Sequence, residues 1–200
     1  MCRFPLFETL AVVDGQFRRV EYHQQRVNFA FQHYFKAECR LVLRQIPIPT
    51  EFQHGFFRCR MDYNASDFAV GFYPYQPRKI EQFQCVYTEN LDYRFKYSDR
   101  KGVDFGQKMQ NVESIIVNNG KVSDCTIGNL LLLKNGVWYS PADYLLKGTQ
   151  LSYLLDQKQV VLTEICPENL FDYQQIMLIN ALNPFELSRA IPINRSAVLI

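Results

Sequence analysis

One stretch in the second half of the chain, Glu113 to Gln150, reads ESIIVNNGKVSDCTIGNLLLLKNGVWYSPADYLLKGTQ and organises the fold. Two apolar segments in it each run into a turn, at Asn118-Asn119-Gly120 and at Asn135-Gly136. Asn and Gly tolerate the positive φ angles that two-residue hairpin turns require, so we expect two β-hairpins. An acidic residue, Asp124, lies between the hairpins, and the stretch ends where Gly148 precedes a helix-like run. This order of features predicts more than a generic globular pattern.

The remainder of the chain contains more strand candidates than helix candidates. Alternating or β-branched runs predict further strands at residues 4–13, 17–20, 55–61, 67–75, 81–87, 160–165 and 175–179. Apolar residues at helical spacing predict a helix over 22–40 that is stopped by Pro47 and Pro49, with others at 99–109 and 150–157 and a helical turn at Pro167. The fold class is therefore α+β.

Composition excludes several classes of function. Hydrophobic residues make up 48% and charged residues 21% of the 200 residues, which is typical of a soluble globular protein. A net charge of +2 gives no field that would recruit nucleic acid or an anionic membrane. The N-terminus lacks the apolar core of an export signal, and no apolar run is long enough to span a bilayer. We expect a cytoplasmic protein that binds neither nucleic acid nor membranes.

The residues that commonly bind metals show no metal-site spacing. The six cysteines are scattered without a C-x-x-C pair, and none of the three histidines lies at ligand spacing from them. We expect no metal site.

The central stretch resembles the core signature of the class IV aminotransferase family, the fold-type IV pyridoxal-phosphate enzymes. Family members read G-x-V-x-E-x-x-x-x-N-hydrophobic, then dG-x-x-x-T-P, then L-L-x-G. The corresponding residues here are Gly120, Val122, Asp124, Asn129, Asn135-Gly136, Ser140-Pro141 and Leu145-Leu146-Lys147-Gly148. The resemblance implies a two-domain D-amino-acid aminotransferase-like fold, with a small α/β domain at 1–90 and a barrel-like domain at 91–200. It also implies pyridoxal 5′-phosphate as the cofactor, bound between them.

Lys96 is the candidate catalytic residue. Taken alone, a lysine in the charged segment Tyr93 to Arg100 would be interpreted as a solvated surface group. The family, however, has a catalytic lysine followed four residues later by arginine or a similar residue, and Lys96 with Arg100 matches that spacing. The resemblance implies that the Lys96 amine binds the cofactor aldehyde and then moves a proton on the substrate.

Asp124 is the candidate partner of the cofactor's pyridine nitrogen. A carboxylate there would keep the ring nitrogen protonated, which lets the ring draw electrons from the substrate. The alternative is an aspartate that caps its own hairpin. The family usually has glutamate at this position, and aspartate is shorter by one methylene group.

Three segments resemble the family's phosphate contacts. Arg26 lies in His23-Gln24-Gln25-Arg26-Val27, which resembles H-x-x-R-L; by spacing alone it would be a helix-surface arginine. Gly148 and Thr149 would offer backbone N–H groups at a helix start, although Gln150-Leu151 replaces the usual Thr-Arg. Asn180 and Ala181 lie in a segment that resembles the second phosphate-binding turn.

The N-terminal strand resembles the family at Phe7-Glu8-Thr9-Leu10, which matches an F-E-T-hydrophobic strand lining the substrate pocket. Members usually carry a further opening hairpin ahead of it, so the resemblance is to a short form. Family members are typically homodimers, and we expect a homodimer here.

Three functions stay open. A lyase converts aminodeoxychorismate to 4-aminobenzoate and pyruvate, and an aminotransferase exchanges amino groups of branched-chain or D-amino acids. The segments 96–100 and 180–184 look closest to the lyase patterns K-h-x-N-R and N-A-L-x-P, so the lyase is the first expectation for this small-molecule enzyme. A third possibility is a non-catalytic descendant that binds the cofactor.

Overall fold

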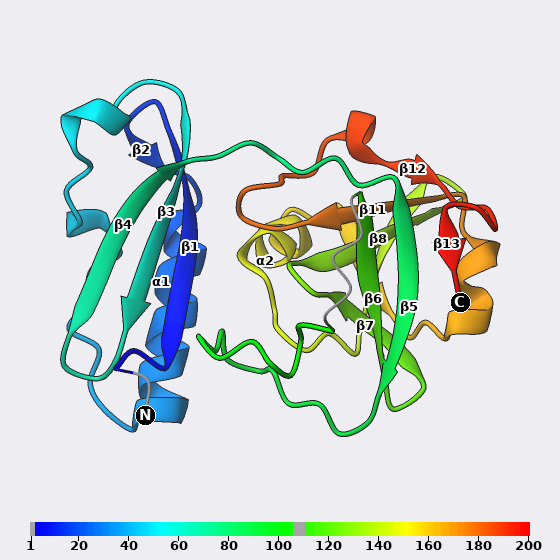
Figure 1. Cartoon of the computed structure of the whole chain (residues 1–200), viewed down its shortest axis with the longest axis horizontal. Helices are drawn as coiled ribbons and strands as arrows, with labels where there is room; N and C mark the ends of the chain where they lie inside the picture. Colours follow the sequence, from blue (N-terminus) through cyan, green and yellow to red (C-terminus); the bar gives the residue numbers. More distant parts are fainter. Residues whose placement is uncertain (1–2, 106–110) are drawn as a thin grey trace. The chain divides into compact units, whose positions relative to one another are not determined.

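The computed structural model describes residues 3–105 and 111–200, and its chain forms two compact units (Figure 1). Unit 1 comprises Met1–Pro77 together with Phe95–Asp99, and unit 2 comprises Arg78–Arg94 together with Arg100–Ile200. The short segment that carries Lys96 therefore packs with unit 1, whereas the sequence analysis places it in a domain at 91–200.

Unit 1 is an antiparallel sheet with one helix on it. Strands follow the order β2-β1-β3-β4, and helix α1 covers one face of the sheet (Figure 1). The elements are β1 (Leu6–Val13), β2 (Gln16–Phe17), α1 (Val20–Ala30), β3 (Phe56–Tyr63) and β4 (Phe68–Pro74), with short 3-10 helices at Leu43–Gln45 and Thr50–Phe52. Because side chains alternate along a strand, Leu6, Leu10 and Val12 face the helix together with Cys59 and Met61.

Two predictions in this unit are wrong in their bounds. The return strand expected at 17–20 is only two residues long, because Arg19 adopts a left-handed conformation (φ 52°) and α1 begins at Val20. The helix expected over 22–40 ends in a π-helical turn at Phe31–Phe35, where Lys36 also turns left-handed (φ 54°). The chain therefore leaves the helix well before Pro47.

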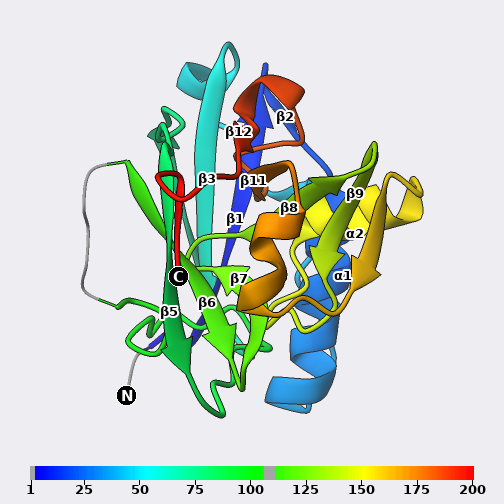
Figure 2. The same ribbon diagram turned by 90° about the vertical axis from the view of Figure 1, so that its right-hand side faces the viewer.

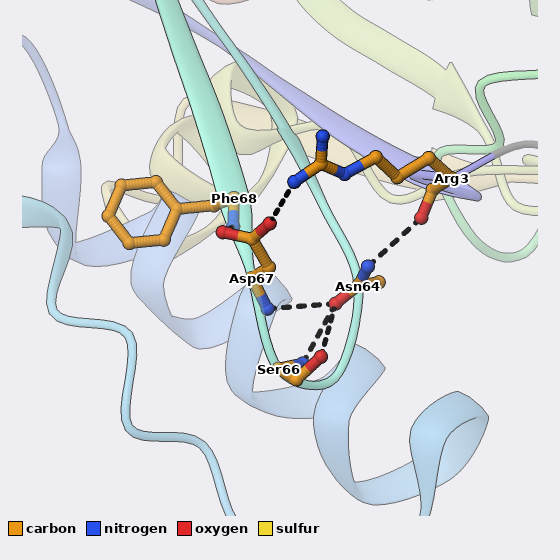
Figure 3. Close-up of polar contacts among 5 residues, drawn as sticks. All are labelled: Arg3, Asn64, Ser66, Asp67 and Phe68. Carbon is orange, nitrogen blue, oxygen red and sulfur yellow. Dashed lines mark hydrogen bonds and ion pairs between the residues drawn. The ribbon is translucent and has the colours of Figure 1, made fainter.

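A polar turn sets the register of the β3–β4 hairpin (Figure 3). The side-chain oxygen of Asn64 accepts hydrogen bonds from the backbone N–H groups of Ser66 and Asp67, both at 2.8 Å. Its amide donates to the Arg3 carbonyl at 3.0 Å, and Arg3 pairs with Asp67 at 2.6 Å. Asn favours turns for this reason, and Tyr63 consequently pairs with Phe68.

The described part of unit 2 contains two sheets, in the orders β13-β5-β6-β7 and β10-β9-β8-β11-β12, together with one α-helix (Figure 2). Its elements are β5 (Gln82–Thr88), β6 (Val112–Asn118), β7 (Lys121–Cys125), β8 (Asn129–Lys134), β9 (Val137–Pro141), α2 (Thr149–Asp156), β10 (Val160–Thr163), β11 (Gln175–Ile179), β12 (Ile191–Pro192) and β13 (Val198–Leu199). Short 3-10 helices occur at Pro167–Asp172 and Leu187–Arg189. Both predicted hairpins are confirmed, with φ angles of 52° and 79° at each Asn-Gly turn.

The sheet that contains β8 and β11 is buried on both faces. Leu130 and Leu132 of β8 pack with residues of β5, β6 and β7, whereas Leu131 packs with Leu151 and Leu154 of α2. A strand buried on both faces must be apolar throughout, which explains the run of four leucines in β8. The class α+β, inferred from the sequence, is confirmed.

The helix expected over 99–109 is not found in its described part. Residues Lys101–Val103 form a turn, and residues 106–109 lie outside the part of the chain that the structure describes. The backbone N–H groups of Val103 and Asp104 both donate to the Arg100 carbonyl.

Candidate active site

The Lys96 segment extends the sheet of unit 1. The N–H group of Phe7 donates to the Lys96 carbonyl at 3.0 Å, and that of Ser98 donates to the Pro5 carbonyl at 2.8 Å. Leu6 and Tyr97 form an antiparallel bridge between these bonds. The segment therefore pairs with the start of β1, and its backbone fixes Lys96 beside the predicted substrate-pocket strand.

The Lys96 amine lies against an aromatic ring. Its Nζ atom is 4.7 Å from the centroid of the Phe7 ring, and the Arg60 guanidinium is 4.1 Å from the same centroid. The face of an aromatic ring attracts cations, so Phe7 contacts both positive groups. Arg60 also pairs with Asp62 through two hydrogen bonds, at 2.8 and 2.6 Å.

Glu8 lies on the opposite, core-facing side of β1 and has two basic partners on α1. Its fully buried carboxylate accepts hydrogen bonds from Nε and Nη2 of Arg26 at 2.7 and 2.6 Å. Nδ1 of His23, which is also fully buried, lies 2.7 Å from Glu8 Oε2. A buried charge is stable only when it is paired and hydrogen-bonded, and these partners supply both conditions.

These contacts set the protonation of the cluster. Burial alone would raise the pKa of Glu8, but the charge of Arg26 and the hydrogen bonds from His23 and Arg26 outweigh it and hold that pKa at about 2. Burial lowers the pKa of His23 despite its contact with Glu8. Glu8 is therefore ionised at neutral pH, and His23 is neutral with its Nδ1 proton donated to Glu8.

This cluster predicts that acid destabilises the protein. The pKa of Glu8 falls from 4.5 to about 2 on folding, so its stabilising contribution is present above pH 4.5 and is lost as the pH falls toward 2. That shift corresponds to roughly 3 kcal/mol of unfolding free energy. The lowered pKa of His23 also makes the folded state less stable in acid, beginning as the pH falls through the ordinary histidine pKa of 6.5. Urea unfolding between pH 7 and pH 3 measures the slope, which should be shallower in Glu8→Gln; equal slopes in the two proteins would contradict the prediction.

In unit 2, the buried Asp124 carboxylate holds a neighbouring loop. Its Oδ2 atom accepts hydrogen bonds from the backbone N–H groups of Leu145 and Leu146, at 3.0 and 2.9 Å. Its Oδ1 atom accepts a bond of 2.7 Å from the side-chain amide of Asn129. At least three of the roughly four acceptor positions of this carboxylate are thus used by the protein itself.

Asn129 extends this contact to the start of α2. Its amide nitrogen also donates to the Leu146 carbonyl at 2.9 Å, and its oxygen accepts a bond from the Gly148 N–H group at 3.1 Å. A Cβ atom on Gly148 would lie 2.1 Å from that oxygen, so the position requires glycine. We call Asp124, Asn129 and the loop 145–148 the clamp.

The clamp places the start of α2 in a buried position. The first N–H groups of a helix have no partner within the helix, and Thr149 and Gln150 are only 3% and 2% exposed. The Oε1 atom of Gln150 is buried, and among the described residues it has no hydrogen-bond partner. A buried acceptor oxygen without a partner indicates a hydrogen-bond donor from a ligand or a water molecule.

The turn at Asn180 lies beside the link between β7 and β8. Asn180 Oδ1 accepts hydrogen bonds from the N–H groups of Leu182 and Asn183, both at 2.9 Å, and its amide donates to the Ile127 carbonyl at 3.0 Å. A Cβ atom on Gly128 would lie 2.3 Å from the Ile179 carbonyl oxygen, so these backbones approach closely. Because Ile179 pairs with Asn129, the turn and the clamp share one end of the sheet.

Arg100 lies in unit 2 although Lys96, four residues earlier, belongs to unit 1. Its guanidinium donates to the Tyr93 hydroxyl at 3.2 Å and to the Thr126 carbonyl. Thr126 in turn donates its backbone N–H group to Glu113 at 3.1 Å. Arg100 therefore supports the link that follows Asp124.

Some of these residues are predicted from the sequence, and others are not. Asp124, Gly148 and Asn180 lie at one end of unit 2, whereas Arg26 and Lys96 lie in unit 1. The contact between Glu8 and Arg26 was missed. A signal exists, because Glu8 alternates with Leu6 and Leu10 on the core face and therefore requires buried partners.

The described residues contain no group of three or more His, Cys, Asp or Glu side chains that could hold a metal ion. They also contain no helix that is both long and apolar enough to cross a membrane.

Comparison with known proteins identifies the family. Residues 102–186 match the model of amino-transferase class IV. An uncharacterised protein of Haemophilus influenzae is 35% identical over 185 residues, which cover 90% of this chain and 98% of the relative. The chain belongs to the class IV aminotransferase family.

Solved structures with the class IV aminotransferase fold are similar to this chain. A candidate 4-amino-4-deoxychorismate lyase from Haemophilus somnus is 36% identical, with a TM-score of 0.82 over 92% of this chain and 100% of that one. A candidate amino-acid aminotransferase from Mesorhizobium loti is 19% identical, with a TM-score of 0.79 over 98% of this chain and 100% of that one. The second likeness shows the fold alone.

Proposed function

We propose that this member of the class IV aminotransferase family is a pyridoxal-phosphate-dependent enzyme, with 4-amino-4-deoxychorismate lyase as the best candidate activity. The observation that carries the proposal is the clamp, which joins a buried carboxylate to a buried helix start through Asn129. A ring nitrogen and a phosphate at two ends of one ligand require this pair of features.

The residues present fit the cofactor. The backbone N–H groups at the buried start of α2, at Thr149 and its neighbours, suit the phosphate. Asn180 and Ala181 offer a second turn, and Arg26 offers a guanidinium, whose planar fork matches phosphate oxygens.

The remaining residues act on the ring and the substrate. Bound pyridoxal phosphate would supply an electron sink for the pair released when a proton leaves the substrate. Lys96 would hold the cofactor aldehyde and then, as a free amine, take the proton from the carbon that bears the substrate's amino group. Asp124 would keep the ring nitrogen protonated while it anchors the loop 145–148.

The choice of the lyase reaction rests on two kinds of support. The segments 96–100 and 180–184 look closest to lyase patterns, and the Haemophilus somnus protein of 36% identity is a candidate 4-amino-4-deoxychorismate lyase. An aminotransferase acting on branched-chain or D-amino acids is the second candidate, because proton removal by the lysine begins both reactions.

Product analysis separates the two candidates. Purified protein loaded with pyridoxal phosphate is incubated with aminodeoxychorismate, and 4-aminobenzoate and pyruvate are quantified by chromatography. A parallel set pairs 2-oxoglutarate with branched-chain and D-amino acids and measures the new amino acid. We expect equimolar 4-aminobenzoate and pyruvate; amino-group exchange alone would favour the aminotransferase. Absence of every product would favour the third possibility, a non-catalytic descendant that binds the cofactor.

We further propose that the enzyme is a homodimer, as expected from the family resemblance. Light scattering coupled to size exclusion measures the mass directly, and the chain mass of 23.6 kDa sets the monomer value. A monomer under these conditions would contradict the proposal.

A further inference from the structure

The guanidinium of Arg26 is oriented by one residue of the neighbouring strand. Glu8 engages both Nε and Nη2 in a bidentate pair, so the plane and the rotation of the guanidinium are fixed relative to β1. The third nitrogen, Nη1, lies outside this pair. Arg26 keeps 14% of its side chain exposed, whereas the Glu8 side chain is fully buried. The carboxylate is therefore the inner part of the pair and the arginine is the outer part.

Glu8 is itself held from three directions. Its backbone pairs with Met61 in the middle of the β1–β3 ladder. Its Oε2 atom contacts both Arg26 and His23, and these two basic residues lie three positions apart on α1. Such spacing places both on one side of the helix, toward the same strand. This environment makes Glu8 a rigid support.

We propose that Glu8 is a positioning residue that holds Arg26 ready to bind the phosphate group of the ligand. The proposal rests on the proposed function, in which Arg26 contacts the cofactor phosphate. A long, flexible side chain loses rotamer freedom when it binds an anion, and a support that orders it beforehand removes part of that cost. Glu8 touches no reacting atom in this role and acts only through Arg26.

A competing role for Glu8 predicts the opposite effect. If Glu8 mainly neutralised Arg26, its removal would leave a stronger positive charge and tighter anion binding. The bidentate geometry favours positioning, because it fixes orientation as well as charge. The two roles therefore differ in the sign of the change in phosphate affinity.

The test compares two probes that differ only in the phosphate. Pyridoxamine 5′-phosphate and pyridoxamine are titrated into the cofactor-free protein by isothermal calorimetry; neither has an aldehyde, so Lys96 forms no covalent link with them. The wild type should prefer the phosphorylated probe. In Glu8→Gln we expect that preference to fall about tenfold, the effect of one charge-assisted hydrogen bond, while pyridoxamine binding stays unchanged. Arg26→Lys should lower the preference for the phosphorylated probe as much, and the variant that combines Glu8→Gln with Arg26→Lys should lower it no further.

His23→Gln is the matched control. It removes a buried partner of Glu8 but leaves both bonds to Arg26, so it should lower thermal stability and preserve most of the preference for phosphate. A purely structural role for Glu8 would make the two variants alike. Glu8→Asp keeps the charge and should restore part of the preference.

Each result bears on a different proposal. If the wild type binds neither probe, the proposed function fails and the role of Glu8 fails with it. If the wild type prefers the phosphorylated probe and Glu8→Gln keeps or increases that preference, only the role of Glu8 is overturned. If the Glu8 variants do not fold, NMR of the wild type decides: the Nε–H signal of Arg26 should persist in slow exchange when pyridoxamine 5′-phosphate binds, and its loss would overturn the positioning role.

Discussion

Replacing Lys96 with arginine is expected to abolish covalent attachment of pyridoxal phosphate and to lower turnover roughly 10³-fold or more, because a guanidinium neither binds an aldehyde nor accepts a proton at neutral pH. Arginine keeps the positive charge that lies over the Phe7 ring. The fold should therefore be retained, since the segment is held by backbone bonds between Phe7 and Lys96 and between Ser98 and Pro5. A loss of activity in Lys96→Arg would then reflect the missing amine and not a loss of the fold.

The measurement combines spectroscopy with peptide mapping. After incubation with pyridoxal phosphate, the wild type should show a visible absorbance band, and borohydride should fix the cofactor to the peptide that contains Lys96. Lys79→Arg is the matched control, because Lys79 is exposed and pairs only at the surface with Glu81 among the contacts described. A Lys96→Arg protein that still acquires the label at a single site would refute the assignment of Lys96.

Local sequence patterns predict the second half of the fold well. Each Asn-Gly pair requires φ angles above zero, and this requirement fixes the position of both hairpins in unit 2. The run of four leucines in β8 and the glycine before α2 are equally local signals. The relevant contacts between Asp124, Asn129 and Gly148 then follow, because the hairpins bring these positions to one end of the sheet.

Features that depend on contacts between distant parts of the chain cannot be predicted from such local patterns. The backbone of Lys96 pairs with the start of β1, about ninety residues earlier, and nothing in the segment 91–100 indicates that pairing. The π-helical turn that follows α1 ends where Lys36 turns left-handed, although lysine is not a residue that favours this conformation. The tertiary environment overrides propensity at both places.

Glu8 and Gln150 show why the candidate site was only partly predicted. Glu8 is hydrophilic, yet its position in β1 puts it among core residues, and its partners on α1 become visible only when strand and helix are packed together. Gln150 differs from the family pattern, and the sequence suggests only that a contact is missing. The structure places Gln150 in the first turn of α2, where its side-chain oxygen is buried and has no hydrogen-bond partner among the described residues.

Replacing Asp124 with asparagine is expected to damage both stability and turnover. The new NH₂ group must face either the N–H groups of Leu145 and Leu146 or the amide of Asn129, and donor then meets donor in a buried site. Leaving buried donors unpaired costs roughly 1–3 kcal/mol of unfolding free energy. Loss of the negative charge beside the ring nitrogen should also lower turnover roughly 100-fold or more.

Two measurements separate these effects, with Asp143→Asn as the matched control. Asp143 lies just before the same loop, but its side chain is 38% exposed and its ion pair with Lys121 is long, with 3.8 Å between Oδ1 and Nζ. Such a surface pair contributes little, so replacing Asp143 should leave stability and activity unchanged. Thermal unfolding reports on the clamp, and turnover measured well below the unfolding transition reports on the ring nitrogen. Wild-type stability in Asp124→Asn would contradict the clamp, and wild-type turnover would contradict the contact with the ring.

Asp124→Glu restores the family's carboxylate at greater reach, so turnover should survive while the contacts with Leu145 and Leu146 weaken; the opposite pattern would mean that aspartate serves the loop alone.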